Sequence, residues 1–120
     1  MTPTIWTMEI PGWRPAALNT LLGNRMKAAS LKKHDREIIC RAVLAYGIPK
    51  AKALRTVRMT LIYTAGERTT DPDSHSKSLL DALVHSGALF NDSRHWVDYD
   101  KPRYARGDVK TTFITLQETE

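Results

Sequence analysis

The sequence contains a single cysteine, Cys40, and this scarcity excludes two kinds of protein. One cysteine cannot close a disulfide within the chain, and it cannot supply the cysteine cluster of a structural zinc site. The chain also lacks a charged-then-apolar leader and an apolar run near the roughly 18 residues that a membrane helix needs. We therefore expect a soluble, cytoplasmic protein with no membrane partner.

Internal repeats and low-complexity linkers are absent too, so we expect residues 1–120 to form a single domain of 13.6 kDa. The expected elements are a strand at 5–10, a helix at about 28–46, a strand at 55–63, a helix from Ser74 and a hairpin of residues 95–104 and 109–116. In the second strand, Val57, Met59, Leu61 and Tyr63 alternate with polar residues, which predicts one buried face. This order predicts an α+β fold, a small mixed β-sheet with helices packed on one face.

Charge is distributed unevenly along the chain. Residues 1–60 hold eleven Lys and Arg against three Asp and Glu, a balance of +8, whereas residues 61–120 hold seven against ten, a balance of −3. Clustered basic residues attract phosphate, so the first half favours a nucleic-acid surface, although a solvated face kept for solubility explains the charge equally well. The residues that we expect to contact DNA are Arg14, Lys32, Lys33 and Arg36.

The acidic half gathers its carboxylates around one lysine. Asp71 and Asp73 are one residue apart, Lys77 follows, and Asp92 lies further along. Carboxylate oxygens are the ligands that Mg²⁺ prefers, and an ammonium group stabilises charge that develops on a phosphate. The stretch therefore predicts a metal-dependent phosphodiester site.

Local geometry makes such a site possible within one chain. Pro72 biases Asp71 toward extended backbone, and Asp73 is placed to cap a helix that begins at Ser74 and ends at Gly87. About twelve helical residues span roughly 18 Å, and an extended segment from Gly87 to Asp92 reaches about 20 Å, so Asp92 can return to the start of the helix. An alternative is an ordinary turn and cap, with Asp73, Lys77 and Asp81 forming a solvated ladder of ion pairs.

These residues resemble the RusA-type Holliday junction resolvases, small endodeoxyribonucleases of bacteria and their phages. The family pattern is D-x-D-N-x-x-K, an aspartate four residues on, an A-L pair, and D-D ahead of an apolar strand. About thirty residues match without a gap, and a weaker likeness covers the loop up to Asn19 and the end of the chain. The matching residues are Asp71, Asp73, Lys77, Asp81, Ala82, Leu83 and Asp92.

The resemblance implies a homodimeric nuclease that depends on Mg²⁺, with Mn²⁺ as a substitute, and that acts in DNA recombination and repair by cutting four-way junctions with paired nicks. By motif position, Asp71, Asp73 and Asp92 bind the metal and Lys77 is catalytic. Ser74 stands where the family has asparagine, and Asn91 replaces the first aspartate of the D-D pair. Two other hypotheses stay open: a non-catalytic DNA-binding accessory of recombination or replication, and a protein-interaction domain.

Overall fold

The central strand of the protein is β2, Arg55–Tyr63, which has the bounds that the sequence predicts. The computed structural model describes residues 3–23 and 25–118, with the side chain of Asn19 excepted. The other strands are β1 (Thr4–Pro11), β3 (Val97–Tyr99), β4 (Arg103–Arg106) and β5 (Thr111–Glu118). The helices are α1 (Leu18–Gly23), α2 (Arg25–Ala45), the 3₁₀ turn η1 (Pro72–His75) and α3 (Ser76–Ser86).

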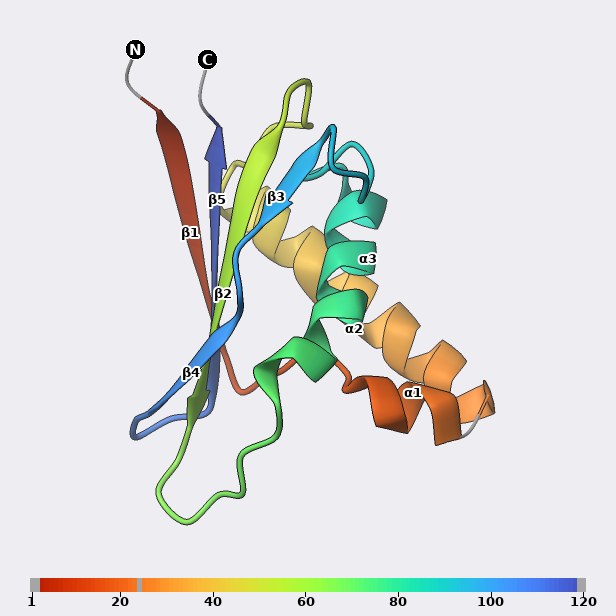
Figure 1. Ribbon diagram of the computed structural model, residues 1–120, viewed down its shortest axis with the longest axis vertical. Coiled ribbons are helices and arrows are strands. Elements are labelled where there is room, and N and C mark those ends of the chain that lie inside the picture. The colour runs from red at the N-terminus through yellow and green to blue at the C-terminus, as the bar shows by residue number, and fades with distance from the viewer. Residues whose placement is uncertain (1–2, 24, 119–120) are drawn as a thin grey trace.

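The five strands form one mixed sheet in the order β1-β5-β2, with both β3 and β4 beside the free side of β2 (Figure 1). Strand β5 pairs antiparallel with β1 and with β2, and its Ile114 lies between Met8 and Met59 in the register. Strands β3 and β4 pair parallel with successive halves of β2. The predicted α+β class with a mixed sheet is confirmed.

The predicted hairpin at the C-terminal end is wrong. Strands β4 and β5 do not pair with each other, because β2 lies between them and pairs with both. The chain crosses the end of β2 after Arg106, where the backbone N–H of Gly107 donates to Tyr63 O at 2.9 Å. The alternation of β2 is consistent with this arrangement: every second residue is buried, as in a strand with a neighbour on each side. Strand β4, exposed along its whole length, has no apolar face to direct it elsewhere.

Helices α2 and α3 cover one face of the sheet, as the sequence predicts (Figure 1). The residues at alternate positions of β2 point into this layer, and Val57 and Leu61 are fully buried there. Their helical partners include Ile39 of α2 and Leu79 of α3, which are also fully buried. Burial of such side chains contributes about 1.5–3 kcal/mol each, so the contact between the sheet and the two helices provides most of the core.

Two helix boundaries differ from the expectation. Helix α2 begins at Arg25 rather than near Ala28, and a separate helix, α1, precedes it where no helix was expected. Helix α3 ends as predicted, because Gly87 adopts the left-handed conformation at φ 85° and its N–H donates to Val84 O. In the part of the chain that the structure describes, no helix is long and apolar enough to cross a membrane.

Candidate active site

The acidic turn ahead of α3 is organised by Asp71. Its backbone is extended, with φ −60° and ψ 119°, as the following proline predicts. Its side chain caps η1 by accepting a hydrogen bond from the N–H of Asp73 at 3.1 Å. The expectation that Asp73 caps the helix was therefore wrong, because a 3₁₀ turn precedes α3 and moves the cap two residues back. Both carboxylate side chains are exposed.

The buried His75 holds this turn against the rest of the domain. Its Nδ1 lies 2.6 Å from Pro15 O, and its Nε2 lies 2.7 Å from Thr70 Oγ1. A carbonyl oxygen only accepts, so Nδ1 carries the proton and Nε2 accepts from the Thr70 hydroxyl. Tyr63 Oη extends this series of hydrogen bonds, at 2.9 Å from Thr70 Oγ1. Burial is the main cause that lowers the pKa of His75, opposed by its hydrogen bond to Pro15.

Helix α3 and the loop after it bring Lys77 and Asp92 to the same cavity. This cavity has a volume of about 230 Å³ and also contains Lys32 of α2. Asp92 thus returns alongside the helix, within the reach that the loop length allows. Asn91 lines the same cavity, and the oxygen of its amide accepts from Ser93 N at 2.8 Å. The remaining lining residues are Ser78, Asp81 and Val84.

The three predicted metal ligands are not gathered in one place within the chain. Asp71 lines a different cavity, of about 730 Å³, which lies between α1 and the segment that leads to η1. Asp73 is near Tyr99 and Ser76 instead: Ser76 Oγ donates to Asp73 Oδ1 at 3.3 Å and lies 2.6 Å from Tyr99 Oη. Among the described residues, no group of three or more Asp, Glu, His or Cys side chains is arranged to hold a metal ion.

Asp81 forms an ion pair with the neighbouring helix. Arg36 of α2 donates to its two carboxylate oxygens at 2.9 and 3.3 Å. The hydrogen bond and the charge of Asp81 together raise the pKa of Arg36. The two side chains are 40% and 41% exposed, so the pair adds little stability, but it fixes α2 beside α3. The ladder of ion pairs along α3 is thus replaced, at Asp81, by a bridge between two helices.

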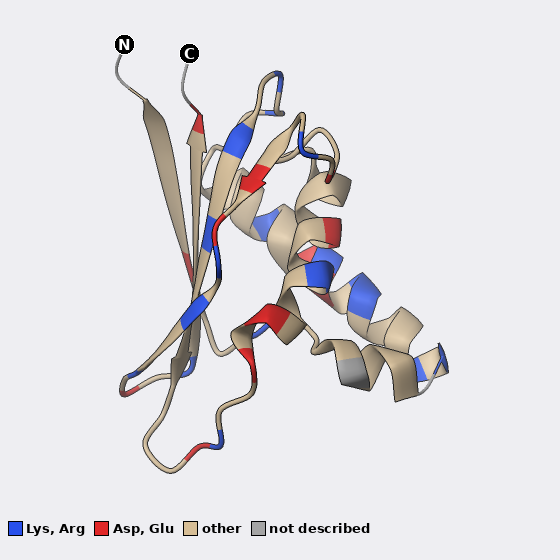
Figure 2. Cartoon of the chain, in the orientation of Figure 1, with Lys and Arg blue, Asp and Glu red and all other residues tan. Residues whose placement is uncertain are grey.

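Basic residues of α2 lie along the same side of the molecule as α3. Figure 2 shows Lys and Arg segments on both helices, with Asp residues interspersed on α3 and at the turn before it. Lys32 reaches the cavity of Lys77, and Lys33 and Arg36 line a second cavity of about 300 Å³ that also includes His85. Three of the four expected DNA contacts therefore lie on the same helix, and one of them, Lys32, shares a cavity with Lys77.

Arg14, the fourth expected DNA contact, lies in a different setting. Its side chain is only 13% exposed, it pairs with Glu67 at 2.7 Å, and its guanidinium lies 3.9 Å from the centre of the Tyr63 ring. The pKa of Glu67 is lowered mainly by a hydrogen bond from the Thr64 N–H, and next by the hydrogen bond from Arg14. Arg14 holds the loop of residues 64–70 to the sheet, so we do not include it in the basic surface.

Asp35 is a buried carboxylate whose role was not predicted from the sequence. It is 3% exposed, and it accepts hydrogen bonds from Trp13 Nε1 at 2.9 Å, Ala16 N at 2.8 Å and Ser78 Oγ at 2.6 Å. These contacts join the loop after β1 to α2 and α3. A signal was present in the sequence, because Asp35 precedes Ile39 and Val43 at helical spacing and so shares their buried stripe.

Ser78 adjoins Lys77, so Asp35 fixes the first turn of the helix that carries the candidate catalytic lysine. Trp13 is buried inside the domain, and its ring N–H donates to the same carboxylate. Asn19, part of the likeness at the loop after β1, has a side chain outside the described residues.

No protein-family model matches the chain, and no curated protein matches it either. The geometry of the side chains therefore carries the functional argument, together with the motif spacing.

Proposed function

We propose that the protein is a Mg²⁺-dependent endodeoxyribonuclease of the RusA type, which resolves four-way DNA junctions as a homodimer. The observation that carries this proposal is the cavity shared by Lys77, Asp92 and Lys32. An ammonium group and a carboxylate at one cavity, beside a second ammonium group, suit a phosphate that must be both bound and attacked. The basic surface formed by Lys32, Lys33 and Arg36 adjoins it.

The proposed ligands are carboxylates, the donor type that a hard divalent cation takes. Asp71 and Asp73 are exposed, and Asp92 is exposed at the edge of the cavity, so their carboxylate oxygens are accessible. Mg²⁺ held by Asp71, Asp73 and Asp92 would supply a nucleophilic water and would polarise the scissile phosphate. In this proposal Lys77 stabilises the charge on the phosphate in the transition state, and Lys32 holds the neighbouring backbone.

A complete ligand set requires Asp71 and Asp73 to meet Asp92, since they line separate places within one chain. A movement of the acidic turn provides one route, and a second subunit provides another. Mixing inactive Asp73→Asn and Asp92→Asn proteins separates them. Carboxylates shared between subunits restore part of the activity in mixed dimers, because one of the two sites keeps every ligand. Carboxylates contributed by a single subunit restore none, since no site in the mixture is complete.

The decisive test is single-turnover cleavage of a synthetic four-way junction, with wild type beside Lys77→Ala and Asp73→Asn. We expect Lys77→Ala to slow cleavage by on the order of 10²-fold or more with little change in junction affinity, as for an interaction made mainly in the transition state. Asp73→Asn should not cleave. Full activity of Asp73→Asn at saturating Mg²⁺ contradicts the metal assignment. Lys33→Ala is the matched control, because it removes a lysine from the same surface but outside the cavity.

The DNA surface has its own test. Six to ten phosphate contacts from a dimer give a slope of roughly −5 to −9 in a plot of log affinity against log salt concentration. Reversal of Lys32, Lys33 and Arg36 to Glu should weaken binding to every DNA and flatten that slope. Light scattering at micromolar concentration should report about twice the chain mass of 13.6 kDa.

A second candidate function is a DNA-binding accessory without catalysis. The observation that favours it is the separation of Asp71 from Asp92, together with Asn91 in place of an acidic residue. It predicts the same salt dependence but no nicking in Mg²⁺ or Mn²⁺. A protein-interaction domain, the third hypothesis, predicts DNA binding too weak to show any salt dependence.

A further inference from the structure

An exposed pair of aromatic rings lies in the loop between α3 and β3. Phe90 and Trp96 are stacked with their ring centres 4.3 Å apart and their planes inclined by 31°. Phe90 is 57% exposed, whereas Trp96 is half-buried behind it. A single exposed apolar residue is ordinary in a protein surface. The inference below therefore rests on how this pair is held and on what surrounds it.

Both ends of the loop are fixed to the core. The buried Arg55 donates to Ala88 O at 2.9 Å, and its backbone N–H donates to Trp96 O at 3.1 Å. Leu89 N–H donates to Leu83 O at the end of α3. Between these anchors, Asn91 Oδ1 accepts from Ser93 N at 2.8 Å. The exposed ring of Phe90 is thus presented in a set position, so a ligand that stacks on it does not have to order the loop first.

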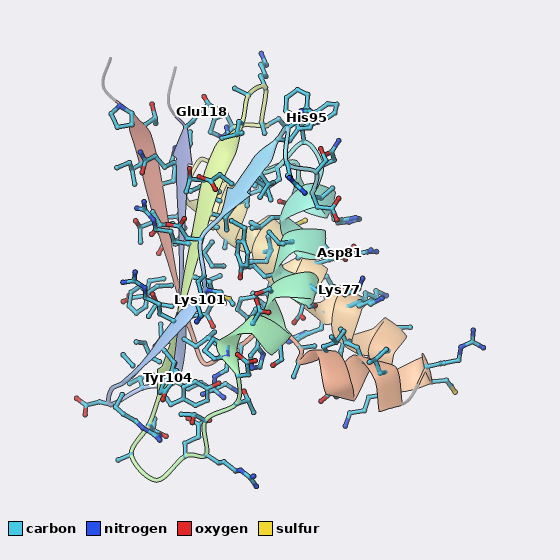
Figure 3. All side chains as sticks on the ribbon, in the orientation of Figure 1. Lys77, Asp81, His95, Lys101, Tyr104 and Glu118 are labelled. Atoms are coloured by element: carbon cyan, nitrogen blue, oxygen red, sulfur yellow. The ribbon has the colours of Figure 1, made fainter. Side chains whose placement is uncertain are left out.

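The loop that carries the pair also carries an exposed arginine, and it adjoins the candidate active site. Arg94 and His95 are exposed in the same loop. In Figure 3, His95 lies beyond the C-terminal end of α3, and Asp81 and Lys77 follow along that helix. Asn91, next to Phe90, lines the cavity that contains Lys77. The exposed ring of Phe90 is therefore one residue away in sequence from the lining of the cavity that contains Lys77.

We propose that Phe90, backed by Trp96, is a stacking platform for one unpaired nucleobase of the DNA whose backbone lies at Lys77. This inference rests on the proposed function. Bases inside a duplex have both faces covered by their neighbours, whereas a base at the branch point of a junction can be released from one of them. Aromatic side chains stack on any base, because every base has a π face, so the platform selects DNA by structure rather than by sequence. Arg94 holds the adjoining phosphate.

Affinity for branched DNA tests the platform. Binding of the full chain is measured in Ca²⁺, which is expected to permit binding with little turnover, on a four-way junction and on a linear duplex of the same sequence. We expect Phe90→Ala to weaken junction binding about tenfold or more, the scale of one stacked base, and to change duplex binding less than twofold. Phe90→Tyr keeps a ring and should bind within about twofold of wild type. Leu44→Ala removes another exposed apolar side chain, on α2, and serves as the matched control.

Photocrosslinking locates the contact directly. A junction that carries 5-iodouracil at a branch-point thymine is irradiated in complex with the protein, and the crosslinked peptide is identified by mass spectrometry. The expected crosslink lies at Phe90 or Trp96, and it is lost when the same base is moved ten pairs into an arm. The urea midpoint of Phe90→Ala, expected to be close to that of wild type, shows that the variant is folded.

The outcomes separate this inference from the proposed function. Junction nicking by a wild-type protein whose Phe90→Ala variant binds and crosslinks equally well overturns the platform and leaves the nuclease intact. Equal loss of junction and duplex affinity in Phe90→Ala also overturns it, because the ring then contacts DNA without selecting the branch. A wild-type protein that binds neither DNA overturns the proposed function and the platform together.

Discussion

Replacement of Asp35 is the sharpest test of how the domain is held together. In Asp35→Ala the three donors that converge on the carboxylate lose their acceptor at once. Trp13 Nε1 and the N–H of Ala16 have no freedom to turn elsewhere, because one belongs to a buried ring and the other to the backbone. The hydroxyl of Ser78 can rotate toward a carbonyl oxygen of its own helix, so its loss is smaller.

The expected loss of stability follows from the number of donors that are left without an acceptor. A buried donor left without a partner costs about 1–3 kcal/mol, so the two fixed donors together cost roughly 2–6 kcal/mol. Removal of a buried carboxylate returns part of that cost, because the native protein pays for its desolvation. We expect Asp35→Ala to lower the free energy of unfolding by about 2–5 kcal/mol. Asp35→Asn can keep the contacts with Ala16 and Ser78 if its NH₂ faces Trp13, so its loss should be about 1–3 kcal/mol.

Equilibrium unfolding in urea, followed by tryptophan fluorescence, measures these differences. A domain of this size is stable by roughly 5–15 kcal/mol, so both losses are well within range. Ser78→Ala is the control, since it removes one donor without stranding another, and we expect a loss near 1 kcal/mol. An Asp35→Ala protein within 1 kcal/mol of wild type, with an unchanged m-value, would refute the argument that this carboxylate joins the three elements.

Three further predictions concern other parts of the structure. Because burial lowers the pKa of His75, the unfolded chain binds a proton more readily than the folded one. Stability in metal-free buffer should therefore fall as the pH drops below the ordinary pKa of about 6.5. The variant His75→Gln should show a smaller change in urea midpoint between pH 7.5 and 5.5. Arg55→Lys keeps the charge but cannot reach Pro49 O, Ala88 O and Glu118 together, so thermal and urea unfolding should show a loss of about 2–4 kcal/mol, and a loss under 0.5 kcal/mol would contradict the role of the buried fork. Gly107→Ala places a Cβ 2.7 Å from Ile62 Cγ2, so it should cost about 1–2 kcal/mol, and the cost should vanish in an Ile62→Ala background.

Local patterns in the sequence predicted the elements whose environment is decided nearby. The alternation of β2 fixed its buried face, because successive side chains of a strand point to opposite sides. Gly87 ended α3, because only glycine enters the left-handed conformation at no cost. The helix at about 28–46 followed from apolar spacing, although its start lay three residues earlier. Each of these features depends on neighbours a few residues away.

Features that depend on distant partners were missed or wrong. The last two strands looked like a hairpin because they are adjacent in sequence, yet the apolar β2 recruits both of them from opposite sides. The number of residues after Gly87 limited the distance that Asp92 could reach but did not determine its position. Asp92 shares a cavity with Lys77 and not with Asp71. Asp35 looked like one acidic residue among many basic ones. Its role appeared only when the loop before α1 and the start of α3 were placed beside it.

The loop of residues 13–16 connects the two halves of the candidate site. Through Trp13 and Ala16 it donates to Asp35, which also holds Ser78 beside Lys77. Through Pro15 O it accepts from His75, which ends the acidic turn. The lysine and the turn are thus fixed to the same four residues. They are also joined directly, because Ser76 at the start of α3 donates to Asp73 through its hydroxyl and through its backbone N–H. A relative movement that brings the carboxylates of the turn toward Lys77 must therefore break the contacts of Ser76 with Asp73 or strain this loop, and the loop's two donors and one acceptor add to what such a movement costs.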